Sequence, residues 1–132
     1  MISKEIAEQE FSRWVDGMGL ELFENLMDND DIKDFTVQKA RILKAIEKGA
    51  LIVSDKNEFV YTPQRSEDAQ PITFYEATGA ALTSMDLKKK DRDMGKMFNA
   101  MASITQTVPK IFNDMKMPDL QVCIAITTLF LA

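Results

Sequence analysis

The chain has 132 residues, 45% hydrophobic and 28% charged, which is typical of one globular domain with a real core. It holds no histidine and only one cysteine, so it lacks the commonest general base and the commonest transition-metal ligand and cannot form an intrachain disulfide. Its net charge of −5 disfavours general nucleic-acid binding, because phosphate backbones repel an acidic protein.

The first segment is predicted to be a helix. Its apolar residues recur at helical spacing and form one stripe: Ala7, Phe11, Trp14, Val15 and Met18. Ser3 is a candidate N-cap, and Gly17 and Gly19 mark the end of the segment.

Two further helices are predicted before residue 50. A short one runs through residues 22–27, and the acidic turn 28–31 is expected to break it. The next is expected over 35–48, with Asp34 as candidate N-cap. Lys44 and Lys48 would complement the helix dipole in its last turns, and Gly49 suits the position after its end.

The pattern then changes to short β-prone runs. Residues 50–53 and 59–62 flank the turn-rich segment 54–58, which predicts an antiparallel hairpin, and Pro63 ends its second strand. Residues 71–76 are a candidate third strand.

Helical patterns return in the last part of the chain, over 77–85 and 91–106. Pro109 and Pro118 are predicted to lie in the first turns of two more helices. The last of these, 118–131, is apolar nearly all round, so it is either central to the core or covered by a partner.

These elements predict an α+β fold, mainly helical, with one small antiparallel sheet near the middle. A single domain over 1–132 is expected, with N-terminal helices in 1–49, a hairpin and third strand in 50–75, and a C-terminal helical bundle in 76–132.

No catalytic constellation is recognisable, so we expect no enzyme, cofactor or metal site. Cys123 lies in the most apolar segment, where burial would make its thiol inert. The acidic turn at 28–31 does not match a calcium-binding loop, because Lys33 and Lys39 stand where glycine and glutamate are required. The five glycines are too scattered for a phosphate loop.

A helix followed by a hairpin also suggests a winged-helix DNA-binding regulator. The helix would offer Lys39, Arg41, Lys44 and Lys48, and the hairpin Lys56. The acidic first third of the chain argues against this alternative.

Methionines cluster between Met85 and Met117. Ordinary core filling explains an inward stripe of Met94, Met97 and Met101, whereas flexible methionines also recur on surfaces that bind varied apolar partners.

Residues 71–132 resemble the tail assembly chaperones of long-tailed bacteriophages and prophages. The first matching features are the strand-like Ile72-Thr73-Phe74 with Glu76 and Thr78, a short helix with Leu82 and Met85, and a charged segment over 86–93. The helix Met94 to Gln106 follows, and its Ala102-Ser103-Ile104-Thr105 is similar to a family motif L-A-x-L-T-G. The last features are the step Val108-Pro109 and a terminal helix from Met117-Pro118-Asp119-Leu120 to Leu129-Phe130-Leu131. Gln106 stands where the family often has glycine, and residues 1–62 are larger and more helical than the family's usual start.

This resemblance implies a protein of the host cytoplasm that binds the aggregation-prone tape measure protein and is absent from the mature virion. Several family members bind copies of themselves, so a homo-oligomer is also implied. The chain shows no signal peptide, and its C-terminal apolar segment is too short to cross a membrane, so neither membrane nor nucleic acid is an expected partner.

We therefore expect a groove for an amphipathic stripe of the tape measure protein, built from Met94, Met97, Phe98, Met101, Leu129 and Phe130. The competing interpretation is that these residues are plain core. The alternative functions are a small structural or adaptor subunit of the tail, which would stay in the virion, and the winged-helix regulator.

Overall fold

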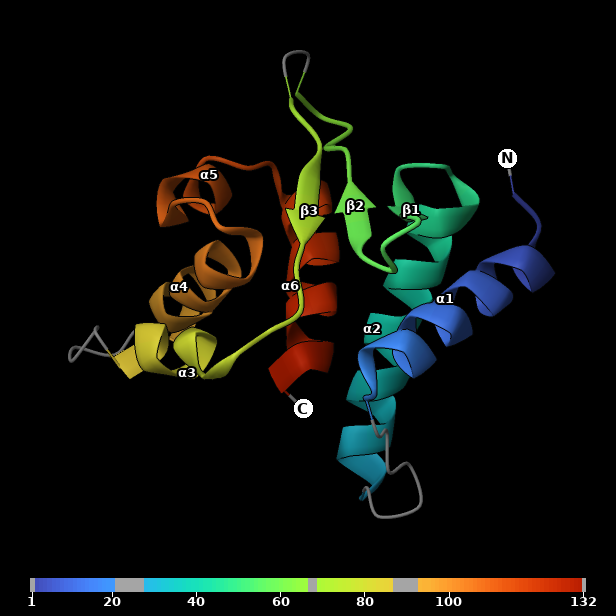
Figure 1. Cartoon of the computed structure of the whole chain (residues 1–132), viewed down its shortest axis with the longest axis horizontal. Helices are drawn as coiled ribbons and strands as arrows, with labels where there is room; N and C mark the ends of the chain where they lie inside the picture. The colour runs from blue at the N-terminus through green and yellow to red at the C-terminus, as the bar shows by residue number, and fades with distance from the viewer. Residues whose placement is uncertain (1, 21–27, 67–68, 87–92, 132) are drawn as a thin grey trace.

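The computed structural model describes residues 2–20, 28–66, 69–86 and 93–131 (Figure 1). Helices predominate in these ranges, around one small antiparallel sheet, which confirms the predicted α+β class. In chain order the elements are α1 (Lys4–Met18), α2 (Asn29–Glu47), β1 (Leu51–Val53), β2 (Phe59–Tyr61), β3 (Ile72–Phe74), α3 (Gly79–Asp86), α4 (Asp93–Thr105), α5 (Pro109–Asn113) and α6 (Met117–Leu131).

Helix α1 forms as its sequence predicts. The hydroxyl of Ser3 accepts a hydrogen bond from the backbone N–H of Ile6, which satisfies a donor at the start of the helix. The helix ends at Met18, and Gly19 follows in the left-handed conformation with φ of 67°. Ala7, Phe11 and Trp14 are its buried residues, so the predicted stripe faces the core.

Helix α2 begins earlier than predicted. Residues 29–31 belong to its first turn and Asp34 lies inside it, so the acidic turn and the Asp34 N-cap were both wrong. The carbonyl of Asp28 already accepts the N–H of Ile32 at 3.0 Å. Acidic side chains near a helix N-terminus complement the dipole, so these residues fit a helix start as well as a turn. The short helix predicted over 22–27 lies outside the described residues.

The sheet contains the predicted hairpin and the candidate third strand. Its strand order is β1-β2-β3, and both pairings are antiparallel. Val60 is opposite Ile52 on one side and Thr73 on the other. Therefore β2 is central, and β1 and β3 are the edges.

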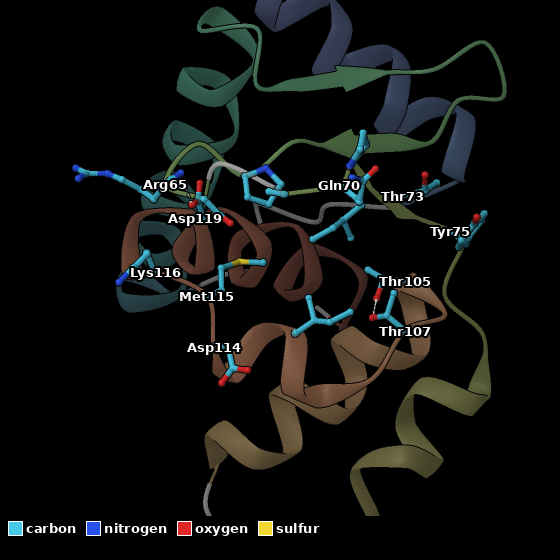
Figure 2. A pocket seen from close by; sticks show the side chains of 16 residues that line it. Arg65, Gln70, Thr73, Tyr75, Thr105, Thr107, Asp114, Met115, Lys116 and Asp119 are labelled. Carbon is cyan, nitrogen blue, oxygen red and sulfur yellow. Dashed lines mark hydrogen bonds between the residues drawn. The ribbon is translucent and has the colours of Figure 1, made fainter.

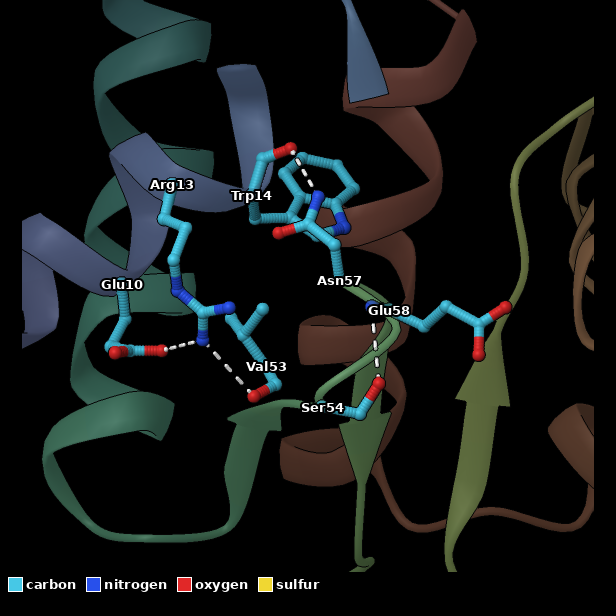
Figure 3. A network of polar contacts seen from close by, with 7 residues as sticks. All are labelled: Glu10, Arg13, Trp14, Val53, Ser54, Asn57 and Glu58. Carbon is cyan, nitrogen blue, oxygen red and sulfur yellow. Dashed lines mark hydrogen bonds and ion pairs between the residues drawn. The ribbon is translucent and has the colours of Figure 1, made fainter. Parts of the chain in front are cut away.

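The hairpin turn docks on α1 through a small polar network (Figure 3). Asn57 has a left-handed backbone, with φ of 61°, and its side-chain amide donates to the carbonyl of Trp14 at 3.3 Å. The Arg13 guanidinium donates to the carbonyl of Val53 at 3.2 Å and pairs with Glu10. These contacts attach the β1–β2 turn to the middle and end of α1.

Helix α6 runs beside the sheet and between the helices of the two chain halves (Figure 1). It contacts α2 and α4, and its buried residues include Leu120, Cys123 and Ile126. The sequence left two explanations for a helix that is apolar nearly all round, a position in the core or cover by a partner. These contacts place α6 in the core. No helix in the described ranges is both long and apolar enough to cross a membrane.

An aromatic cluster joins distant parts of the chain in this core. Trp14 stacks on Phe59 with ring centroids 4.3 Å apart, and it meets Phe130 edge-on at 5.2 Å. The three rings belong to α1, β2 and α6, so the N-terminal helix, the sheet and the C-terminal helix share one packed centre.

Candidate partner-binding site

The six side chains predicted to form a partner groove divide between the core and its border. Met101 and Leu129 are buried in the core. Met97, Phe98 and Phe130 are half-buried and pack against it. Met94 belongs to α4, and its side chain lies outside the described residues. The two pockets described below are lined by other residues.

A pocket of about 580 Å³ lies between the edge strand β3 and the start of α6 (Figure 2). Four segments form its walls: the chain after β2, β3 with its flanks, the end of α4, and the region from α5 into α6. The lining residues are Pro63, Arg65, Ser66, Ala69, Gln70, Pro71, Ile72, Thr73, Tyr75, Thr105, Thr107, Ile111, Asp114, Met115, Lys116 and Asp119. We call this cavity the β3 pocket.

Asp119 lines one end of the β3 pocket, and only 1% of this residue is exposed to solvent. One carboxylate oxygen accepts hydrogen bonds from the Tyr61 hydroxyl at 2.6 Å and the Gln64 N–H at 2.8 Å, and the other accepts from the Arg65 N–H at 3.0 Å. Three donors offset much of the penalty of burying a carboxylate. Asp119 thereby attaches the first turn of α6 to the chain that leaves β2.

The Asp119 cluster keeps its neighbours protonated. Burial, and next the hydrogen bond to Asp119, raises the pKa of the Tyr61 hydroxyl well above its ordinary value. Burial likewise raises the pKa of the Cys123 thiol, and the Asp119 charge adds to the effect. Cys123 is buried, as predicted, and a protonated thiol there is a poor nucleophile.

The mouth of the β3 pocket combines two cations with apolar surface. Arg65 and Lys116 lie at the same end of the pocket (Figure 2), and neither side chain has an ion pair within the described ranges. Two carboxylates also line the pocket, Asp114 and the buried Asp119, so the formal charges of its lining balance. Ile111 is 40% exposed, and Met115 is half-buried. The pocket can therefore receive an apolar group beside an anionic one.

A left-handed turn after α4 shapes the far wall. Gln106 has φ of 56°, with its N–H bonded to the carbonyl of Ser103 and the next N–H bonded to the carbonyl of Ala102. These two hydrogen bonds form a Schellman motif at the end of the helix, which favours glycine at the left-handed position. The turn brings the hydroxyls of Thr105 and Thr107 within 2.7 Å of each other in the pocket wall.

A second pocket, of about 510 Å³, lies between α1 and α2, with Lys4, Glu8, Ala40, Leu43, Lys44, Glu47 and Lys48 in its lining. Lys44 and Lys48 are two of the cations that the winged-helix alternative would use. A third, Lys39, pairs with Glu8 at 3.4 Å and lies over the ring of Phe11, so it contacts α1.

Neither the β3 pocket nor the role of Asp119 was predictable from a local sequence pattern. Asp119 and Tyr61 are 58 residues apart, and no local pattern links them. The helix-start position of Asp119 was recognisable, but an acidic residue there is ordinarily solvated. The available signal was a carboxylate in the first turn of a helix that is otherwise apolar nearly all round.

Protein-family models, curated proteins and solved structures contain no match to the chain. Within the described ranges, no group of three or more histidine, cysteine or acidic side chains could hold a metal ion.

Proposed function

We propose that this chain is a tail assembly chaperone, which binds the tape measure protein at the β3 pocket and keeps it soluble until the tail assembles. The ordered motifs of residues 71–132 support the family. The pocket supports the site, because most of its lining residues belong to the same 71–132 region. On this proposal the protein acts in the host cytoplasm and is absent from the mature virion.

The surface around the β3 pocket suits a chaperone. Val108 and Met117 are exposed apolar residues next in sequence to the lining residues Thr107 and Lys116, and Ile111 lies between them. A contiguous exposed apolar patch marks a protein-binding surface more often than scattered residues do, and we expect these residues to contribute to one. The net charge of −5 would help keep a complex with an apolar partner in solution.

Co-expression with the tape measure protein tests the proposal. The tape measure protein should become soluble and co-purify with the wild-type chain. Ile111→Asp places a charge on the pocket wall and should abolish co-purification. Ile6→Asp is the matched control, because Ile6 is 48% exposed on α1, outside the pocket lining, and should leave capture intact.

The outcomes separate the function from the site. If the wild-type chain leaves the tape measure protein insoluble and unbound, the chaperone proposal is wrong. If both variants capture it equally well, the function stands and the site is elsewhere. Mass spectrometry of purified particles addresses the adaptor alternative, because a chaperone should be missing from them.

A further inference from the structure

The hydrogen-bond pattern of the sheet determines which peptide groups of β3 face outward. The Thr62 N–H donates to the Ala50 carbonyl, and the Ser54 N–H donates to the Glu58 carbonyl. In an antiparallel ladder bonded pairs alternate, so Ile52 and Val60 form the bonded pair between these two. The peptide groups of Val60 therefore face β1, and those of Phe59 and Tyr61 face β3.

On β3 the alternation continues. Ile72 and Phe74 are opposite Tyr61 and Phe59, so their peptide groups face β2. The N–H and carbonyl of Thr73 consequently point away from the sheet. The Tyr75 N–H points to the same side, where it donates to the Ile104 carbonyl at 3.1 Å. For Thr73 there is no corresponding bond within the described ranges, and both Thr73 and Pro71 line the β3 pocket.

We infer that the β3 pocket binds its partner as an added β-strand: an extended segment of the tape measure protein pairs with Thr73 and carries an acidic residue next to an apolar one. This inference builds on the proposed function and specifies the conformation and chemistry of the bound segment.

The backbone of β3 offers a short, defined edge. An antiparallel residue opposite Thr73 would exchange two hydrogen bonds with it, and the Pro71 carbonyl offers one more. Pro71 has no N–H to donate, and the Tyr75 N–H is already bonded to α4, so pairing is limited at both ends. Such an edge favours modest affinity for many similar segments over indefinite strand growth.

The pocket walls determine the side chains of the added strand. Successive side chains alternate between faces, so the neighbours of the residue opposite Thr73 lie on the Ile72 side. The lining residues Ile111 and Met115 supply apolar surface for a side chain of the added strand. Arg65 and Lys116 at the end of the pocket complement a carboxylate. Asp114 and the buried Asp119 balance these two cations over the lining as a whole, which fits one acidic residue placed beside Arg65 and Lys116 better than an acidic run.

Residue-resolved hydrogen–deuterium exchange on the full chain, alone and in complex with co-expressed tape measure protein, tests strand addition directly. The Thr73 amide should exchange rapidly in the free chain and become protected in the complex, whereas the Phe74 amide should change little. A complex in which Thr73 exchanges as fast as in the free chain overturns the inference and leaves the proposed function standing. Failure of the wild-type chain to form a complex overturns both.

A pair of substitutions provides a second measurement. Thr73→Pro removes the outward N–H without removing a bond to β2, and it should weaken capture roughly tenfold. Thr73→Val keeps the N–H and should bind like the wild type. If Thr73→Pro fails to fold, the exchange measurement on the wild-type chain decides.

Charge reversal tests the acidic residue. Arg65→Glu combined with Lys116→Glu should weaken capture about tenfold. Lys44→Glu combined with Lys48→Glu, in the pocket between α1 and α2, makes the same change in net charge and should not. Equal effects of the two pairs would overturn the proposed acidic residue.

Discussion

Asp119 illustrates how one buried side chain can join segments that are distant in sequence. It accepts hydrogen bonds from the Tyr61 hydroxyl and from two backbone N–H groups of the chain after β2. Because these three donors bond only to Asp119 within the described ranges, removing the carboxylate leaves all three unsatisfied near the core.

Replacing Asp119 by leucine should therefore lower the free energy of unfolding by about 3 kcal/mol, a value at the high end for one buried polar residue. Denaturant titration measures the loss. A double-mutant cycle with Tyr61→Phe should give a coupling of roughly 1–2 kcal/mol between the two side chains. Strictly additive effects would show that the Tyr61 hydrogen bond contributes nothing beyond the other two.

Tyr61 should also make stability depend on alkaline pH. Burial raises the pKa of its hydroxyl in the folded chain, so the unfolded chain loses this proton first. The contribution of Tyr61 is complete below its unfolded pKa of about 10 and is lost as the pH rises above that value. Unfolding measured between about pH 9 and 11 should show a shallower decline in Tyr61→Phe than in the wild type. Identical slopes in the two chains would exclude Tyr61 as a cause of the loss of stability at alkaline pH.

The left-handed turn after α4 provides a further test at single residues. Gln106 adopts a conformation that costs a residue with a side chain about 1 kcal/mol relative to glycine. Gln106→Gly should raise the thermal midpoint, and Gly49→Gln, at a left-handed position with φ of 79°, should lower it. If Gln106→Gly is destabilising, the side chain makes a compensating contact that outweighs the backbone strain.

At the scale of elements, α1 and the hairpin turn come into close contact where the Asn57 side chain passes Gly17. An added Cβ at Gly17 would lie 1.9 Å from the side-chain nitrogen of Asn57, which donates to the Trp14 carbonyl. Gly17 therefore leaves room for the Asn57 amide to reach the Trp14 carbonyl of α1, and Figure 3 shows that hydrogen bond.

Gly17→Ala should destabilise the wild-type chain, because the amide must leave its position. In an Asn57→Gly background the same substitution should instead stabilise by roughly 0.5–1 kcal/mol, the usual gain of alanine over glycine within a helix. Thermal unfolding of the four chains measures this sign change. Gly17→Ala effects of the same sign in both backgrounds would contradict it.

Element boundaries show where local patterns are sufficient and where they are not. The ends of α1 were predictable because Ser3 and Gly19 make local capping contacts, and the strands were predictable from β-prone runs between turn residues. The start of α2 was not, because aspartates favour a turn and a helix N-terminus alike. The β3 pocket depends on four segments that only the tertiary structure brings together, and no periodicity encodes it.

At the scale of the whole molecule, the region that resembles the phage family is packed on the region that does not. Helix α6 contacts α2, and Phe130 meets Trp14 of α1. Asp119 also depends on Tyr61 and the residues after β2. The motif-bearing half therefore lacks a complete core of its own.

A fragment of residues 71–132 should consequently fail to fold alone, because removing its partners exposes the apolar faces of α6 and β3. Circular dichroism with heating should show no cooperative transition for the fragment and a clear one for the full chain. Mixing it with a fragment of residues 1–70 should restore cooperativity. A cooperative transition in the isolated fragment would show that the family-like region is an independent folding unit.

Trp14 is the single tryptophan of the chain, and its indole N–H is buried without a hydrogen-bond partner in the described ranges. An indole in such dry surroundings, packed between two phenyl rings, is an intrinsic fluorophore whose emission should be shifted to the blue. Because its neighbours come from β2 and α6, the emission wavelength of Trp14 reports whether α1, β2 and α6 are packed together. The β3 pocket does not include Trp14, so partner capture should leave this signal unchanged while unfolding shifts it to the red.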